Sequence, residues 1–143
     1  LASMFSAFAN GGNIATPYVV KGLYKEDGIR YKCQVSHPEA NWKEGVLSEH
    51  AIEVITPFLE DVTDPKINGT GRNLKVKGCT VAAKTGTAEI GSSKSREIAW
   101  FVGFRTGVSD EDARLVLVML EVPAESKYSN LKFDIARPLL SME

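Results

Sequence analysis

The chain has 143 residues, of which 43% are hydrophobic and 24% are charged, and its formal net charge is −1. This length suffices for one domain with a hydrophobic core, and the ordinary globular composition argues against general disorder. Because the sequence has no basic excess or stripe, we expect no nucleic-acid partner. No apolar run reaches the ~20 residues that a membrane helix needs.

The two cysteines, Cys33 and Cys79, are too few for a disulfide scaffold or a four-cysteine zinc site. We expect two buried free thiols, and a single disulfide is the alternative.

The first third of the sequence predicts a short helix followed by a β-hairpin. Apolar side chains recur at helical spacing from Ala2, and residues 10–12 (Asn-Gly-Gly) should end the helix because they accept left-handed backbone geometry. Residues 18–24 and 29–35 are typical of strands, and the turn-forming residues between them indicate a hairpin.

The middle of the sequence predicts one amphipathic helix between two loops. Residues 36–45 are polar and should form a loop, after which Ser48 is suited to cap a helix. Apolar residues from Ala51 to Val62 follow the i, i+3, i+4, i+7 pattern, although Pro57 inside it should bend or interrupt the helix. Residues 63–78 are rich in Gly, Asn, Asp and Lys, so we expect a mobile surface loop there.

The final third predicts three strands, at 79–88, 98–105 and 114–123, and a terminal helix at 130–142. The unbroken apolar run at 115–120 is typical of a strand in the middle of a sheet. In the terminal helix, the apolar face should consist of the residues spaced at i, i+4 and i+8, which are Leu131, Ile135 and Leu139. Strands and helices do not alternate as βαβ units, which favours an α+β fold with an antiparallel sheet of three C-terminal strands packed with helices.

The strongest chemical signal is Lys84-Thr85-Gly86-Thr87, inside the strand predicted at 79–88. A lysine ammonium attracts a carboxylate, and threonine hydroxyls can donate hydrogen bonds to it. Glycine removes a side chain where a ligand must lie close to a strand. An exposed strand edge can pair with an extended peptide, and its backbone N–H groups can stabilise a developing oxyanion. These four residues are therefore our candidate binding site.

Three further segments accompany this tetrapeptide: Phe8–Gly12, Gly69–Gly71 and Ala99–Phe104. Together with K-T-G they resemble the C-terminal half of the transpeptidase domain of penicillin-binding proteins, particularly the high-molecular-mass class B type. The resemblance covers nearly the whole chain. We therefore expect residues 1–143 to be a single structural unit, the C-terminal part of such a domain.

The resemblance implies a peptidoglycan D,D-transpeptidase that cross-links stem peptides ending in D-Ala-D-Ala through an acyl-serine intermediate. β-Lactams would acylate the same serine. Lys84 would position the substrate or β-lactam carboxylate, Thr85 and Thr87 would donate hydrogen bonds to it, and Gly86 would leave room for the ligand. The Thr87 N–H would supply half of the oxyanion hole. No metal or organic cofactor is implied.

The resemblance also implies a location, since such proteins act on the extracytoplasmic face of the bacterial cell membrane and are anchored by an N-terminal helix.

Side chains alternate between the two faces of a strand, so the geometry of the site can be predicted as well. We expect Thr85 to face opposite to Lys84 and Thr87 unless the strand kinks at Gly86.

The sequence departs from the family pattern in its catalytic motifs. The family nucleophile lies in S-x-x-K and is followed by S-x-N, and both precede K-T-G. This sequence has no S-x-N, and its S-x-x-K match, Ser129–Lys132, comes after K-T-G. We interpret that match as accidental, expect the catalytic serine and its lysine upstream of residue 1, and predict that the chain alone is inactive.

An incomplete domain should also leave an unpaired strand edge. We expect residues 114–122 to pair with a second copy of the chain, with the missing N-terminal part of the domain, or with the hairpin at 18–35. A strand-paired homodimer is therefore one predicted assembly.

Two rival functions remain open at this stage. The first is a β-lactam sensor or β-lactamase-type domain, which shares the K-T-G strand, and the second is a non-catalytic peptide-binding module.

The remaining candidate residues carry weaker signals. They are two histidines without metal-ligand spacing, His37 and His50, and three carboxylates more typical of solvated surfaces, Glu49, Glu53 and Glu89.

Overall fold

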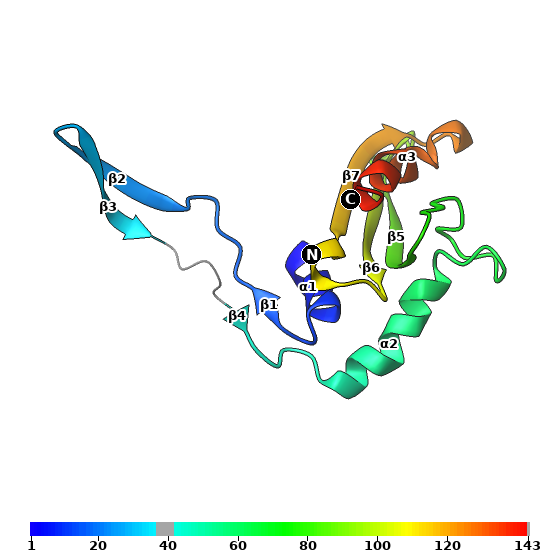
Figure 1. Cartoon of the computed structure of the whole chain (residues 1–143). Helices are drawn as coiled ribbons and strands as arrows, with labels where there is room; N and C mark the ends of the chain where they lie inside the picture. Colours follow the sequence, from blue (N-terminus) through cyan, green and yellow to red (C-terminus); the bar gives the residue numbers. More distant parts are fainter. Residues whose placement is uncertain (37–41, 143) are drawn as a thin grey trace.

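The protein, described here from a computed structural model covering residues 1–36 and 42–142, has an α+β architecture (Figure 1). This agrees with the fold class expected from the sequence. None of the helices in the described part of the chain combines the length and the apolar character of a membrane span. In chain order the elements are α1 (Ala2–Ala9), β1 (Ile14–Ala15), β2 (Gly22–Asp27), β3 (Arg30–Ser36), β4 (Trp42–Lys43), α2 (Glu49–Asp61), β5 (Thr80–Ile90), β6 (Arg96–Thr106), η1 (Asp110–Asp112), β7 (Leu115–Pro123), η2 (Ser126–Tyr128) and α3 (Leu131–Leu140).

The antiparallel sheet of β5, β6 and β7 carries the hydrophobic core. β6 lies between the other two strands and pairs with β5 over the whole length of both. Because side chains alternate along a strand, the sheet has two faces. One face is covered by α3, and α1 packs against β6 and β7 from the other. The core on the α3 face consists of Leu74, Val81, Ala83, Phe101, Val118, Phe133, Ala136 and Leu140.

α3 packs with a different face from the one predicted. Leu131, Ile135 and Leu139 are exposed, whereas the buried apolar side chains of this helix belong to Phe133, Ala136 and Leu140. The ring of Phe133 meets Phe101 of β6 edge to face, with the ring centroids 5.8 Å apart. Both stripes are apolar and both have helical spacing, so the fit against the sheet decides which stripe is buried.

The order of strands also differs from the prediction. The apolar run at 115–120 was expected in the middle of a sheet, but β6 occupies that place and β7 pairs, within the described residues, only with β6. α3 covers one face of β7, where Val118 and Val122 are buried, while Met119 on the opposite face is 55% exposed. The apolar run is therefore well buried on its α3 face and less covered on the opposite face.

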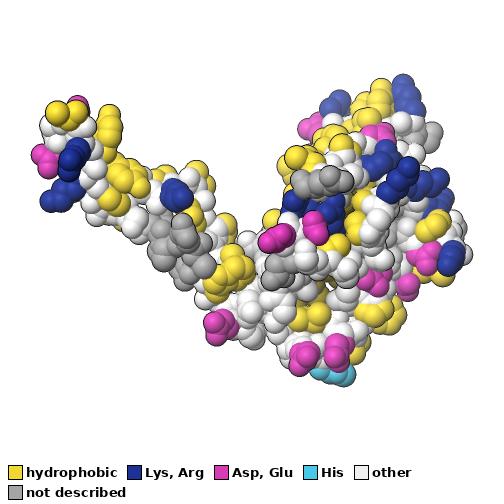
Figure 2. Space-filling view, in the orientation of Figure 1, with side chains coloured by type: hydrophobic (Ala, Val, Ile, Leu, Met, Phe, Trp, Pro, Cys, Tyr) yellow, Lys and Arg dark blue, Asp and Glu magenta, His cyan; other side chains and the backbone are white. Residues whose placement is uncertain are grey.

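The predicted hairpin is confirmed as β2 and β3, with its turn at Gly28 and Ile29 rather than at 25–28. Gly28 has a φ of +66°, the left-handed geometry that such a turn requires. The hairpin projects away from the rest of the molecule (Figure 1), so it does not pair with β7. Its surface carries several exposed apolar side chains (Figure 2). The short pair β1–β4 at its base was not predicted.

α2 begins as predicted, because the Ser48 hydroxyl accepts a hydrogen bond from the Ala51 N–H at 3.2 Å. Pro57 does not interrupt it, and the helix continues to Asp61. Pro57 lies on the exposed side of the helix, where water can reach the carbonyl that loses its backbone donor.

The two cysteines are free, as expected, but the expectation that both are buried was wrong. Cys33 is exposed on the hairpin and Cys79 is partly exposed just before β5.

Residues 63–78, which we call the strap, have no helix or strand but are packed rather than loose. The Gly71 N–H donates to the Val62 carbonyl at 2.7 Å, and Leu74 is buried in the core. Gly69 passes so close to the end of α2 that a Cβ there would lie 2.3 Å from the Asp61 carbonyl oxygen. The expectation of a surface loop therefore fails at Leu74 and at the two glycines.

This close approach predicts that Gly69→Ala destabilises the protein by about 1–3 kcal/mol, because the strap must move away from α2. Gly86→Ala is the matched control, since a Cβ at Gly86 would make only ordinary contact, 3.4 Å from Trp100 Cβ. The free energy of unfolding, measured by urea denaturation, checks this. Equal stability of the two variants would contradict it.

Candidate functional site

The K-T-G residues lie in the middle of β5, which is an edge strand of the sheet. Their register with β6 is unbroken, from Lys84 opposite Val102 to Thr87 opposite Ala99. Lys84 and Thr87 are exposed, while Thr85 and Gly86 are partly exposed. The four residues are thus presented at the surface rather than enclosed in the core.

The faces of the strand differ from the expectation. Because the register has no bulge, side chains alternate regularly. Thr85 and Thr87 therefore share the α3 face, and Lys84 and Gly86 share the opposite face. The expected placement of Thr87 with Lys84 was wrong, since three residues separate them and an odd separation puts side chains on opposite faces.

The backbone of β5 shows which groups point away from β6. The Thr63 hydroxyl donates to the Val81 carbonyl at 2.7 Å, and Lys84 Nζ donates to the Thr85 carbonyl at 2.6 Å. In a regular antiparallel strand, the N–H and C=O of one residue point to the same side and this side alternates. The N–H and C=O of Thr87 consequently also project from the open edge.

The hydrogen bond of Lys84 also decides where its charge lies. The side chain leaves the strand on the face opposite to α3, but Nζ reaches the Thr85 carbonyl at the edge. The ammonium, the Thr85 backbone and the Thr87 N–H are therefore all presented along one open edge of the sheet.

The strap adds a residue to this edge. The Thr70 hydroxyl lies 2.9 Å from the Thr85 hydroxyl, a hydrogen bond in which either group can donate. Thr70 was not among the predicted site residues, because residues 69–71 were part of the family resemblance and carried no predicted role. The contact joins residues 15 positions apart, and it forms only when the strap folds over β5.

Gly86 leaves space on the Lys84 face of the strand. It lies directly opposite Trp100, and a Cβ at this position would touch the Trp100 Cβ at 3.4 Å. A longer side chain would cover the partly exposed indole. The glycine therefore keeps the strand surface beside Lys84 open to a ligand.

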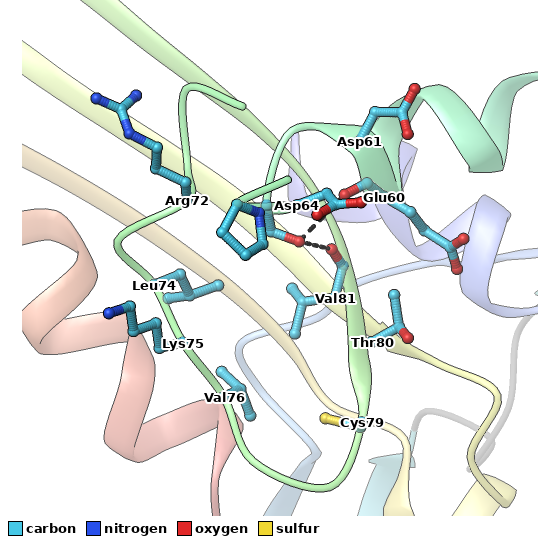
Figure 3. Close-up of a pocket in the computed structure, with 12 residues that line it drawn as sticks. Glu60, Asp61, Asp64, Arg72, Leu74, Lys75, Val76, Cys79, Thr80 and Val81 are labelled. Atoms are coloured by element: carbon cyan, nitrogen blue, oxygen red, sulfur yellow. Dashed lines mark hydrogen bonds between the residues drawn. The ribbon is translucent and has the colours of Figure 1, made fainter. Parts of the chain in front are cut away.

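A separate cavity of about 570 Å³ opens between the end of α2, the strap and the start of β5 (Figure 3). Leu74, Lys75 and Val76 of the strap line one side, and Cys79 and Val81 lie across from them. None of the four K-T-G residues lines this cavity, which lies at the Thr80–Val81 end of the strand. It is therefore distinct from the candidate site.

The S-x-x-K match lies around the start of α3. Lys132 is 8% exposed, and burial lowers the pKa of its ammonium group, while the negative charge of Glu97 opposes this shift. α3 covers the sheet face opposite to the one from which Lys84 projects. This position is consistent with the interpretation that the motif is accidental, which stays a prediction.

The other residues considered from the sequence lie at the surface. Glu89 pairs with Lys94 at 2.7 Å, with both side chains more than half exposed. Among the side chains that the structure describes, no three of His, Cys, Asp or Glu gather where they could hold a metal ion. His37 lies outside the described residues, while Glu49, His50 and Glu53 are exposed on α2.

Comparison with known proteins identifies the family. Residues 1–141 match the model of the penicillin binding protein transpeptidase domain. Stage V sporulation protein D of Bacillus subtilis is 35% identical over 122 residues, which are 82% of this chain and 18% of that protein. A peptidoglycan D,D-transpeptidase homologue of Mesostigma viride is 30% identical over 97 residues, or 62% of this chain and 16% of that protein. The chain thus spans less than a fifth of these relatives.

Solved structures share the fold. The D,D-transpeptidase domain of a peptidoglycan glycosyltransferase from Eggerthella lenta is 28% identical with a TM-score of 0.61, covering 94% of this chain and 31% of that one. Penicillin-binding protein A from Mycobacterium tuberculosis, in its imipenem acyl-enzyme complex, is 20% identical with a TM-score of 0.63 over 99% of this chain and 30% of that one. The motifs around K-T-G, the α+β fold and these matches lead to one conclusion: the chain belongs to the transpeptidase domain family of penicillin-binding proteins.

Proposed function

We propose that the chain supplies the K-T-G edge of a peptidoglycan D,D-transpeptidase. The enzyme would cross-link stem peptides ending in D-Ala-D-Ala and would be acylated by β-lactams. The observation that carries the proposal is the open edge of β5, where a lysine ammonium, a threonine hydroxyl and an outward backbone N–H occur together. An extended peptide can pair with such an edge.

In this proposal Lys84 and Thr85 hold the carboxylate of the stem peptide or β-lactam. Lys84 Nζ exchanges its hydrogen bond with the Thr85 carbonyl for a stronger, charge-assisted one to the ligand. Thr85 donates its hydroxyl proton to the carboxylate, and its oxygen then accepts the hydrogen bond that the Thr70 hydroxyl donates. Thr87 donates a further hydrogen bond from its side chain, and Gly86 leaves room for the ligand.

The acyl transfer itself uses a serine outside this chain. Its Oγ bonds to the carbonyl carbon of the penultimate D-Ala, the C–N bond breaks, and the terminal D-Ala leaves with a proton on its nitrogen. An amine of a second stem peptide then forms the new amide and restores the serine hydroxyl. The N–H of Thr87 and that of the serine would stabilise the oxyanion in both steps, so the chain's own residues bind and stabilise rather than attack.

We further propose that residues 1–143 form one structural unit within a larger transpeptidase domain. The N-terminal part of that domain would supply the serine, its lysine and a strand for the free edge of β7. The whole protein would lie at the extracytoplasmic face of the bacterial membrane, held by an N-terminal helix. When the chain is alone, a second copy can pair with β7 instead, which gives a strand-paired homodimer.

The proposed carboxylate site gives a prediction for Lys84 in the full-length protein. Lys84→Ala should slow covalent labelling by a fluorescent penicillin about 10- to 100-fold, because a charge-assisted hydrogen bond to the carboxylate is lost. Lys25→Ala on the hairpin is the control and should label at the normal rate. Normal labelling of the Lys84 variant would remove Lys84 from the site.

The 143 residues alone should form no covalent adduct with penicillin, since the nucleophile lies elsewhere. Intact-mass spectrometry of the chain after incubation with the drug measures this directly. A stoichiometric adduct at Ser129 would overturn both the location of the serine and the interpretation of Ser129–Lys132 as accidental.

The free edge of β7 predicts association of the isolated chain. Size-exclusion chromatography at high concentration should show a dimer or a larger species, because unpaired apolar strand edges recruit further strands. A monomer at all concentrations would count against the pairing of β7 with a second copy.

A further inference from the structure

One side chain of α3 clamps the strap. Arg137 Nε donates to the Leu74 carbonyl at 2.6 Å, and Nη2 donates to the Asn73 carbonyl at 3.0 Å. Nη1 meets Asp134 Oδ1 at 3.2 Å, one turn earlier on the same helix. All three guanidinium nitrogens are thus engaged, and the rigid planar group fixes two successive carbonyls.

The backbone of the strap turns sharply at this clamp. Lys75 follows directly after the two residues whose carbonyls Arg137 binds. Its φ is +45°, a left-handed backbone conformation that residues other than glycine rarely adopt. The Asn73 side-chain amide donates to Asn130 Oδ1 at 3.0 Å, just before α3. Leu74 enters the core between these contacts and points toward Val81 (Figure 3). The strap is therefore seated on α3 by Arg137, Asn130 and the burial of Leu74.

The clamped residues are linked to Thr70 by consecutive backbone hydrogen bonds. The Leu74 N–H donates to the Gly71 carbonyl at 2.9 Å, and the Arg72 N–H donates to the Gly69 carbonyl at 3.1 Å. Residues 69–74 therefore form two overlapping turns with little freedom to move separately. A shift at Leu74 must move Thr70 relative to Thr85, whose hydroxyl lies 2.9 Å away.

We propose that Arg137 is a positioning residue for the carboxylate site. By holding the strap on α3 it sets the Thr70 hydroxyl against Thr85, and so orients the Thr85 hydroxyl toward a ligand at the open edge of β5. Arg137 itself makes no contact with the ligand. The inference rests on the proposed function of the K-T-G edge and extends it to the C-terminal helix.

The chain contains a matched control. Arg105 also donates to backbone carbonyls around the end of α3, from Nε to Leu140 at 2.6 Å and from Nη2 to Met142 at 2.9 Å. Its chemistry is the same as that of Arg137, but its partners lie away from the strap. Replacing Arg105 should therefore lower stability without changing the carboxylate site.

The test compares Arg137→Gln with Arg105→Gln in the full-length protein, using stopped-flow acylation by a β-lactam. Arg137→Gln should weaken the initial binding constant about fivefold, the worth of one neutral hydrogen bond, and leave the acylation rate constant unchanged. Arg137→Lys, which keeps a cationic donor, should have an intermediate effect. Arg105→Gln should bind normally even if its melting temperature falls as far.

A double-mutant comparison tests the route through Thr70. In a Thr70→Val background, Arg137→Gln should add little further loss of binding, since the hydroxyl that it positions is gone. Fully additive losses, normal binding by Arg137→Gln, or an equal loss in Arg105→Gln would each overturn the proposal.

A readout without ligand separates this inference from the proposed function. The NMR methyl signals of Thr70 and Thr85 should shift in Arg137→Gln and stay in place in Arg105→Gln. Unchanged methyl signals in both variants would refute the positioning role even if the enzyme is active. A wild-type protein that no β-lactam acylates would instead refute the proposed function.

Discussion

The unbroken pairing of β5 with β6 is the constraint on which the candidate site depends. Ladder hydrogen bonds over the full length of both strands exclude a bulge, and this determines the face of every K-T-G side chain. The same pairing uses one edge of β5 and leaves the other for a ligand. The Lys84 side chain projects from one face of the strand, but it is long enough for Nζ to lie at the open edge, where it donates to the Thr85 carbonyl.

Hydrogen bonds and buried side chains, rather than surface ion pairs, hold the strap beside the open edge of β5. Arg137 makes an ion pair with Asp134 at 3.2 Å, but exposed pairs of this kind contribute little to stability. Its two hydrogen bonds to strap carbonyls, together with the burial of Leu74, connect the C-terminal helix to the segment beside Thr85. A helix at the far end of the sequence thus helps to define a site near its middle.

Local patterns predicted the elements well, because helix caps, turn residues and hydrophobic period act over a few residues. The cap at Ser48, the hairpin and the three C-terminal strands are examples. K-T-G could likewise be identified from the sequence, because it is a short contiguous motif. Relations between distant residues were not predicted. The buried stripe of α3 and the central place of β6 depend on tertiary packing, and the Thr70–Thr85 contact depends on the fold of the strap. The position of the catalytic serine stays a prediction.

A crystal structure of the full-length protein acylated by a β-lactam would show whether the edge of β5 binds the ligand. If it does, we expect the acyl carbonyl oxygen about 3 Å from the Thr87 backbone nitrogen and the β-lactam carboxylate between Lys84 Nζ and Thr85 Oγ1. An acylated protein whose β-lactam carboxylate contacts neither of these groups, with the Thr87 N–H directed elsewhere, would contradict it.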